Sequence, residues 1–428
     1  MVIAFDGSRD IFHPLMYICP MFLFIYTYMP MRLHSAGQLA IYFDDSQLVF
    51  IQMLNLLGVI AFIGGCLAAG FRTASPGEYF AAQVFDGRRL LIGGAVAGTI
   101  GLVAWIISIV NVGGFVNAFD HSYGGGWDSS GYVRDAAILL LIGVLLIQGS
   151  MAVSGPGSGP SFTSITLAIV FATPWLVQAL LTSRRGPTFA FAVMAGASWY
   201  LYRNRRPPLI LGTVMGLALG YFIIFLVVNR NNIHLGTDLE LSTDVTSVTE
   251  GANTGNEYIY GGGAVLSSRK AGHYYWGKRY LAQVTVRPIP SAIWPTKYAD
   301  FGLPELLTNA GTGEGFGEAL GWKGAPGSAP GVIADLWLEF WWFSVPVLAL
   351  MGWGYGRVWL KAVTMGGPWL SQYCVFFAIS IYFVMQTMEA VIFRTIQMSI
   401  PIWITWTWAA RRYENVGWVP RTRWARPA

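Results

Sequence analysis

The residues most able to do chemistry lie in one polar stretch, residues 230–331, where the charged side chains are sorted by sign. Between residues 231 and 268 every charged residue is acidic, and the six charged residues from Arg269 to Lys297 are all basic. Acidic residues return from Asp300 to Glu318. Long apolar segments flank the stretch, so this block of positive charge predicts an anionic ligand that is bound beside a membrane.

The basic block interleaves cations with aromatic rings, as HYYWGKRYLAQVTVRPIPSAIWPTKY over residues 273–298. Nucleic-acid binders also show such interleaving. Here the nine acidic residues of the loop balance its eight basic ones, which argues against nucleic acid as a partner. A lipid-linked saccharide would use both features, with rings for sugars and cations for phosphates. The alternative is a cluster of interfacial aromatics that contacts lipid head groups. The candidate ligands for phosphate in this block are Lys278, Arg279, Arg287 and Lys297.

Composition places the rest of the chain in a membrane. Of the 428 residues 54% are hydrophobic and 11% are charged, whereas a soluble domain carries about 25% charged residues. The apolar segments run for about 20 residues without alternation, which favours helices over a barrel. The predicted fold class is therefore an all-α polytopic membrane protein.

Apolar length predicts about ten spans: 11–30, 48–70, 90–111, 134–153, 163–181, 187–202, 208–229, 332–352, 369–387 and 391–410. The sixth is short, and the count could change by one or two there. The chain thus divides into spans one to seven (1–229), a large loop (230–331), and spans eight to ten with a basic tail (332–428).

The basic residues outside the large loop fall on one side of these spans. With the N-terminus inside, 14 Lys and Arg residues lie in the cytoplasm and 5 lie outside. Cytoplasmic loops carry such an excess. We therefore expect both termini in the cytoplasm and the large loop on the outer side.

Arg184 and Arg185, in TSRRGPTF, are exceptions to this bias. A pair of guanidinium groups on the outer side can bind a phosphate through a fork of donors. The alternative is that both side chains extend into the head-group layer without a ligand.

Asp335 and Glu339 lie four residues apart and so share one face of a helix, at the outer end of the eighth span. One could act as a general base for a sugar hydroxyl. The favoured alternative is a structural ion pair with Arg184, Arg185 or Arg287. Glu389 and Arg394 form a second candidate pair, also interpreted as structural.

Two further features of the loop have weaker signals. His273 is the histidine nearest the basic block and is a candidate base, although a solvated histidine is the more common case. No two histidines show metal-ligand spacing with a carboxylate, so no metal and no cofactor is predicted. The Gly-rich residues 311–331 fit either a mobile lid or a plain connector.

Four stretches resemble the bacterial oligosaccharide repeat-unit polymerases, the O-antigen and exopolysaccharide polymerase family. They are FHPLMYICPMFLFIYTYMP, TSRRGPTFAF, HYYWGKRYLAQVTVRPIPSAIWPTK and GSAPGVIADLWLEFWWFSVPVLALMGWGYG. With the topology, the resemblance covers most of the chain.

The resemblance implies a glycosyltransferase of the helical GT-C type in the bacterial inner membrane. It would transfer a nascent chain from polyprenyl pyrophosphate to the next lipid-linked repeat unit at the periplasmic face. It would use neither a nucleotide sugar nor a metal, with a chain-length regulator and a flippase as partners. Under this reading Arg184, Arg185 and Arg287 neutralise the departing pyrophosphate. A polysaccharide ligase of similar architecture, or a transporter or flippase for an anionic lipid-linked saccharide, are the alternatives.

Overall fold

A computed structural model describes residues 1–71, 84–120, 131–154, 161–229, 232–236, 241–243, 257–289, 293–301 and 329–411. Helices dominate these residues, and the only strands among them are β1 (Val84–Phe85) and β2 (Ala410–Arg411), which pair antiparallel. The first half of the chain forms α1 (Val2–Ser8), α2 (Pro14–Leu23), η1 (Phe24–Tyr28), α3 (Met29–Ser35), η2 (Leu39–Ile41), α4 (Asp45–Ala68), α5 (Gly87–Asn111), α6 (Phe115–Phe119), α7 (Gly131–Ala136), α8 (Leu139–Val153), α9 (Phe162–Leu181), α10 (Arg185–Phe191), η4 (Ala192–Ala197), α11 (Ser198–Tyr202) and α12 (Leu209–Val228).

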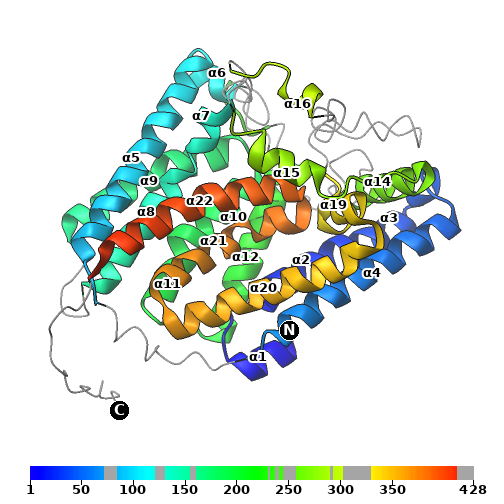
Figure 1. Cartoon of the computed structure of the whole chain (residues 1–428), viewed down its shortest axis with the longest axis horizontal. Helices are drawn as coiled ribbons and strands as arrows, with labels where there is room; N and C mark the ends of the chain where they lie inside the picture. Colours follow the sequence, from blue (N-terminus) through cyan, green and yellow to red (C-terminus); the bar gives the residue numbers. More distant parts are fainter. Residues whose placement is uncertain are drawn as a thin grey trace.

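The described part of the large loop contains three short helices, and the last helices of the chain follow it. The loop helices are α14 (Glu257–Ala271), α15 (Lys278–Thr285) and α16 (Lys297–Asp300). After them come α19 (Gly331–Phe340), η5 (Trp341–Phe343), α20 (Ser344–Met365), α21 (Gly367–Met385) and α22 (Met388–Ala409). In Figure 1, α6, α15 and α16 lie along the upper side of the bundle and α1 lies at its lower side. We call the side that carries α14–α16 the loop end.

Eight helical segments within the described residues are long and apolar enough to cross a membrane. They are Pro14–Ser35, Asp45–Ala68, Gly87–Asn111, Val133–Val153, Phe162–Leu181, Leu209–Val228, Gly331–Met365 and Gly367–Met385. The chain is therefore an all-helical, polytopic membrane protein. The predicted sixth and tenth spans are also helical, as α10–η4–α11 and α22, but neither meets these criteria.

The predicted span 332–352 falls within the candidate span Gly331–Met365, but the helix is interrupted inside it. Trp341 takes φ 52° and ψ −134°, a backbone conformation that does not continue a helix, so α19 ends at Phe340 and α20 begins at Ser344. With its 22 residues, α20 is about 33 Å long and can cross the bilayer core without α19. The short helix α19 is instead buried almost throughout its length.

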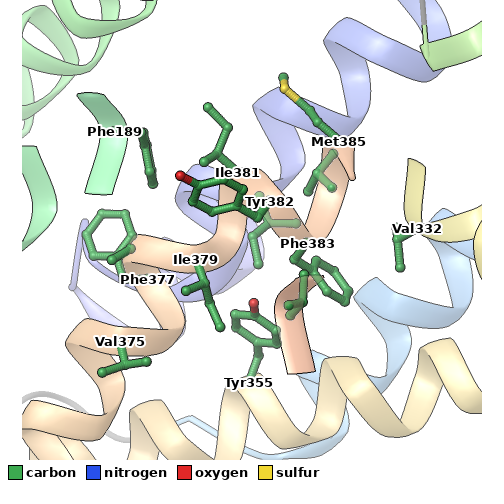
Figure 2. Packing of buried hydrophobic residues seen from close by; sticks show 14 of the residues in the cluster. Phe189, Val332, Tyr355, Val375, Phe377, Ile379, Ile381, Tyr382, Phe383 and Met385 are labelled. Carbon is green, nitrogen blue, oxygen red and sulfur yellow. The ribbon is translucent and has the colours of Figure 1, made fainter. Parts of the chain in front are cut away.

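The core lies around α21, most of whose residues are buried, whereas Leu226 is the one buried residue of α12. Figure 2 shows aromatic side chains of this core, with Phe189 of α10 beside Phe377 and Tyr355 of α20 beside Phe383. The ring centroids of these pairs lie 5.9 and 5.3 Å apart. Such tilted contacts are the favourable arrangement for aromatic pairs.

Small residues set the distances between the most closely packed helices. A Cβ on Gly352 of α20 would overlap the backbone of Phe62 in α4, and a Cβ on Gly143 of α8 would overlap Gly98 in α5. Glycine at the helix interfaces of membrane proteins permits this close approach. The loop helices pack on the bundle in the same manner, because Gly261 of α14 leaves space for the carbonyl of Pro330.

Candidate functional site

The described residues place Arg279 among three carboxylates at the loop end. Arg279 is 1% exposed, and its Nη2 donates to Asp335 Oδ1 at 2.7 Å. Its Nε donates to Glu389 Oε1, also at 2.7 Å, and lies 3.5 Å from Glu339 Oε1. One residue of α15 is thereby bonded to both α19 and α22. We call Arg279, Tyr280, Asp335, Glu339 and Glu389 the Arg279 cluster.

The two carboxylates of α19 differ in how many of their oxygens accept hydrogen bonds. Asp335 Oδ2 accepts from the Tyr280 hydroxyl at 2.7 Å and from the Met388 N–H at 2.8 Å, so both Asp335 oxygens are bonded. Glu339 Oε2 accepts from the Gly277 N–H at 2.6 Å. Glu339 Oε1 is buried and has no hydrogen-bond partner among the described residues. Asp335 is therefore fixed at the first turn of α22, whereas Glu339 retains an oxygen that can accept a proton.

The electrostatics of α15 follow from this burial. Burial alone would lower the pKa of Arg279, but the charges of Asp335 and Glu389 outweigh it and hold that pKa well above its ordinary value. Burial, followed by the charge of Asp335, raises the pKa of the neighbouring Tyr280 hydroxyl. Arg279 thus stays cationic and Tyr280 stays a neutral hydrogen-bond donor.

A second group of charges lies beside this cluster and is rich in arginine. Asp135, which follows Arg134 at the start of the fourth span, accepts from Arg287 Nη2 at 2.8 Å and lies 3.3 Å from Arg134 Nη2. The Arg287 Nη1 donates to Gln283 Oε1 at 3.0 Å. The guanidinium group of Arg287 also lies 4.4 Å from the ring centroid of Phe393 in α22.

Tyr382 of α21 joins further arginines to this group. The Arg394 guanidinium lies 4.3 Å from the Tyr382 ring centroid, and its Nη1 is 3.4 Å from Gln386 Oε1. The charges of Arg184 and Asp135 also act on Tyr382. Gly186 permits this proximity, because a Cβ there would overlap the Tyr382 ring. We call the group formed by Arg134, Asp135, Arg184, Arg287, Tyr382 and Arg394 the arginine face.

The two groups are contiguous. Arg287 of the arginine face lies within electrostatic range of Glu389 in the Arg279 cluster. Both groups also use the first turns of α22, through Glu389 on one side and Phe393 and Arg394 on the other. A ligand at the junction would meet guanidinium groups on one side and carboxyl groups on the other.

The six predicted phosphate ligands lie in different surroundings. Arg184 and Arg287 belong to the arginine face, and Arg279 belongs to the cluster named after it. Arg185 forms an ion pair with Glu257 and so joins α10 to α14. Lys278 is exposed, whereas Lys297 is buried and donates to the carbonyls of Arg287 and Ile289 at 3.2 and 2.5 Å. Lys297 therefore fixes the backbone that carries Arg287.

Both predicted ion pairings of the acidic residues were wrong. Asp335 and Glu339 pair with Arg279, and not with Arg184, Arg185 or Arg287, because α15 inserts Arg279 between α19 and α22. Glu389 likewise pairs with Arg279. Arg394 contacts Tyr382 and Gln386 instead, from the next turn of α22.

The remaining sequence candidates are less informative. His273 is exposed, with its ring centroid 4.9 Å from that of Tyr275. Most of the Gly-rich stretch 311–331, and Pro290 of the Arg-Pro-Ile-Pro run, lie outside the described residues. The sequence reasoning did not select Asp135 or Tyr382. Arg134, one of the few cations predicted on the outer side, was the available signal for Asp135.

The arrangement can hold an anion beside groups that accept protons. Guanidinium groups bind phosphate oxygens through paired N–H donors. Among the described residues, no group of three or more His, Cys, Asp or Glu side chains is arranged to hold a metal ion. Comparisons with protein-family models, with curated proteins and with solved structures find no significant match to this chain.

Proposed function

We propose that this chain is a glycosyltransferase of the bacterial inner membrane that polymerises oligosaccharide repeat units carried on polyprenyl pyrophosphate. The observation that supports this proposal most is that the arginine face lies within electrostatic range of the Arg279 cluster at the loop end of a membrane bundle. The reaction releases a pyrophosphate anion at the membrane surface and removes a proton from an acceptor hydroxyl. It therefore needs the two kinds of group that lie next to each other here.

In the proposed reaction, the acceptor hydroxyl oxygen attacks the anomeric carbon of the donor. The bond between that carbon and the phosphate oxygen breaks, and its electron pair leaves with the pyrophosphate. Arg287, Arg184 and Arg394 stabilise this developing negative charge. The hydroxyl proton passes to a carboxylate, for which Glu339 Oε1 is the best placed acceptor because it has no hydrogen-bond partner in the part of the chain that the structure describes. Asp335, with both oxygens bonded, acts as a positioning residue.

An apolar cavity next to these groups can accommodate a lipid chain. Its volume is about 270 Å³, and it is lined by side chains of α20, α21 and α22 that include Tyr355, Phe376, Phe383 and Ile392. Met388, which also lines the cavity, donates its N–H to Asp335. A polyprenyl chain in this cavity would bring its pyrophosphate to the first turn of α22.

A polysaccharide ligase would use the same donor, and only the acceptor distinguishes the two activities. A transporter for an anionic lipid would instead show charged residues deep in several spans or two similar halves. The charges described above gather at one end of the bundle, which favours an enzyme at the membrane surface.

The decisive experiment incubates purified protein in detergent with lipid-linked repeat units, with and without excess EDTA. We expect a ladder of polymers in both conditions, because arginines can supply the positive charge that a divalent ion would give. Lys270→Met, a change of an exposed lysine at the end of α14 that is not among the candidate phosphate ligands, serves as the control and should give the same ladder. Absence of polymer in every condition would contradict the proposed function. Activity that disappears with EDTA and returns with Mg²⁺ would contradict only the metal-independent mechanism.

A further inference from the structure

Three large aromatic rings are exposed where α19 gives way to α20. Trp276, Trp341 and Phe343 are 57%, 42% and 59% exposed. The ring centroids of Trp276 and Phe343 lie 6.3 Å apart, and Tyr274 lies at the same distance from Trp341. We call Trp276, Trp341 and Phe343 the aromatic shelf. Burying such rings is normally favourable, so their exposure needs a reason.

The backbone at both tryptophans is strained. Trp276 and Trp341 each have φ 52°, a region that bulky side chains rarely adopt. The turn at Trp276 is nevertheless held in place, since its N–H donates to the Glu339 carbonyl at 2.7 Å and the Tyr275 N–H donates to the Leu338 carbonyl at 3.0 Å. Strain of this kind persists only where the surroundings determine the conformation, and it is concentrated at functional sites.

A buried layer of aromatic side chains lies beneath the shelf. Trp337 is 1% exposed, and its Nε1 donates to the Ser268 hydroxyl at 3.1 Å. The Trp337 ring contacts Tyr274 at 6.0 Å and Trp342 at 5.1 Å between centroids. The shelf therefore rests on a rigid support and presents its rings in a fixed arrangement.

Two other exposed tryptophans, one near the middle of α20 and one near the end of α22, differ in one respect. Trp353 of α20 has the Arg357 guanidinium 5.7 Å from its ring centroid, and Trp408 of α22 has that of Arg89 at the same distance. A tryptophan paired with a cation is typical of a membrane interface. In the part of the chain that the structure describes, no Lys or Arg stacks on the rings of the aromatic shelf. Their faces are available to a neutral ligand.

We propose that the aromatic shelf binds sugar rings of the glycan by stacking, next to Glu339. This inference rests on the proposed function for its choice of a saccharide. Sugar rings present C–H groups to an aromatic face, and the electron-rich face of Trp attracts such groups. The hydrogen bond from the N–H of Gly277, the residue after Trp276, to Glu339 Oε2 places the shelf beside the carboxylate that accepts the proton. The shelf would thus orient the acceptor sugar.

The first test measures binding of lipid-free repeat-unit oligosaccharide, released by mild acid from the lipid-linked precursor of the source cells. We expect the double change Trp276→Leu and Trp341→Leu to weaken its binding at least about tenfold, with an unchanged thermal midpoint. The control is Trp353→Leu, because Trp353 is 43% exposed and so matches Trp341, but lies near the middle of α20. Trp341→Gly gives a second variant that suits the backbone, since glycine adopts φ 52° without strain. Unchanged binding in both shelf variants, or no binding to the unmodified protein, would overturn the proposal.

A second test separates a saccharide site from a lipid-facing belt. A nitroxide label at position 276 should be accessible to a water-soluble nickel complex, and a label at position 353 should be more accessible to oxygen dissolved in the lipid. The cysteines at positions 19, 66 and 374 are buried, which favours labelling at the introduced site. A label at 276 that behaves like the one at 353 would contradict the proposal. Because neither test needs polymerisation, oligosaccharide binding by a protein that makes no polymer would leave the shelf intact and contradict the proposed function.

Discussion

The Arg279 cluster and the arginine face lie side by side at the loop end, but their charges are balanced in opposite ways. In the cluster, three carboxyl groups surround one guanidinium group that is 1% exposed. In the arginine face, Asp135 lies among several arginines, and its ion pair with Arg287 is partly exposed, with the Arg287 side chain at 27%. Buried ion pairs are difficult to break, whereas exposed ones contribute little to stability.

The difference suggests a division of tasks. The cluster joins α15, α19 and α22, so removing its members should first affect folding. The arginine face is partly exposed and holds several guanidinium groups, so changes there should first affect activity. Each prediction below tests one side of this comparison.

The largest effect on stability is expected from Arg279→Met. This change leaves three carboxyl groups buried without their cation, and breaking a buried pair in this way costs about 3–5 kcal/mol. Thermal unfolding in detergent should show a large fall of the midpoint. Lys278→Met is the matched control, because Lys278, which precedes Arg279 in the chain, is exposed and should tolerate the same change. An Arg279→Met protein as stable as the unmodified one would show that the cluster does not hold the loop helices.

Arg287→Lys should produce the opposite pattern. Lysine keeps the charge but cannot bond both Asp135 and Gln283 as the planar fork does. We expect the polymerisation rate to fall by about two orders of magnitude, as when one donor to a developing anion is lost, with little change of the thermal midpoint. Arg203→Lys, at the other end of the bundle, provides the control. Normal activity of Arg287→Lys would remove the arginine face from the mechanism.

Asp335→Asn and Glu339→Gln separate two roles within the cluster. Asp335 accepts charge-assisted hydrogen bonds at both oxygens, so its amide variant should lose about 1.5–3 kcal/mol of stability. Glu339→Gln keeps an acceptor for the Gly277 N–H and removes one of the crowded negative charges. It should therefore fold normally but lose kcat, with KM nearly unchanged. If Glu339→Gln keeps full activity while Asp335→Asn folds well and is inactive, the two roles are reversed.

Apolar length predicted most of the membrane helices to within a few residues. The predicted 163–181 and 208–229 correspond to α9 at Phe162–Leu181 and α12 at Leu209–Val228. The break at Trp341 could not be predicted in this way, because residues 340–343 are all aromatic and contain neither glycine nor proline. The conformation of Trp341 depends on contacts with the loop, since Tyr275 and Trp276 bond the last carbonyls of α19.

The sequence singled out acids and several arginines that the structure brings together at the loop end, but it did not predict their pairings. It singled them out because charges next to apolar spans need a reason. It could not indicate that Arg279 bonds Asp335 and Glu389, which lie 56 and 110 residues away along the chain. Local pattern contains no information on such distant contacts. Tyr382 and Tyr280 gave no signal at all, since tyrosine is common in membrane proteins.

The smallest effect is expected at Asp300, on the side of the arginine face. Asp300 Oδ2 accepts from Trp294 Nε1 at 2.6 Å and from the Thr296 hydroxyl at 2.7 Å, and these two bonds lower the pKa of the exposed carboxyl. They shape the turn that carries Lys297, which in turn holds the carbonyl of Arg287.

A carboxyl whose pKa is lower in the folded state stabilises the fold above its unfolded pKa, which is about 3.9 for Asp. That contribution is lost as the pH falls through the folded pKa. Asp300→Asn should therefore reduce the thermal midpoint slightly at pH values near 7, and the difference from the unmodified protein should shrink as the pH falls below about 4. Melting curves of both proteins across this pH range provide the measurement. A difference that stays constant, or grows on acidification, would show that the Asp300 charge does not stabilise the turn that carries Lys297.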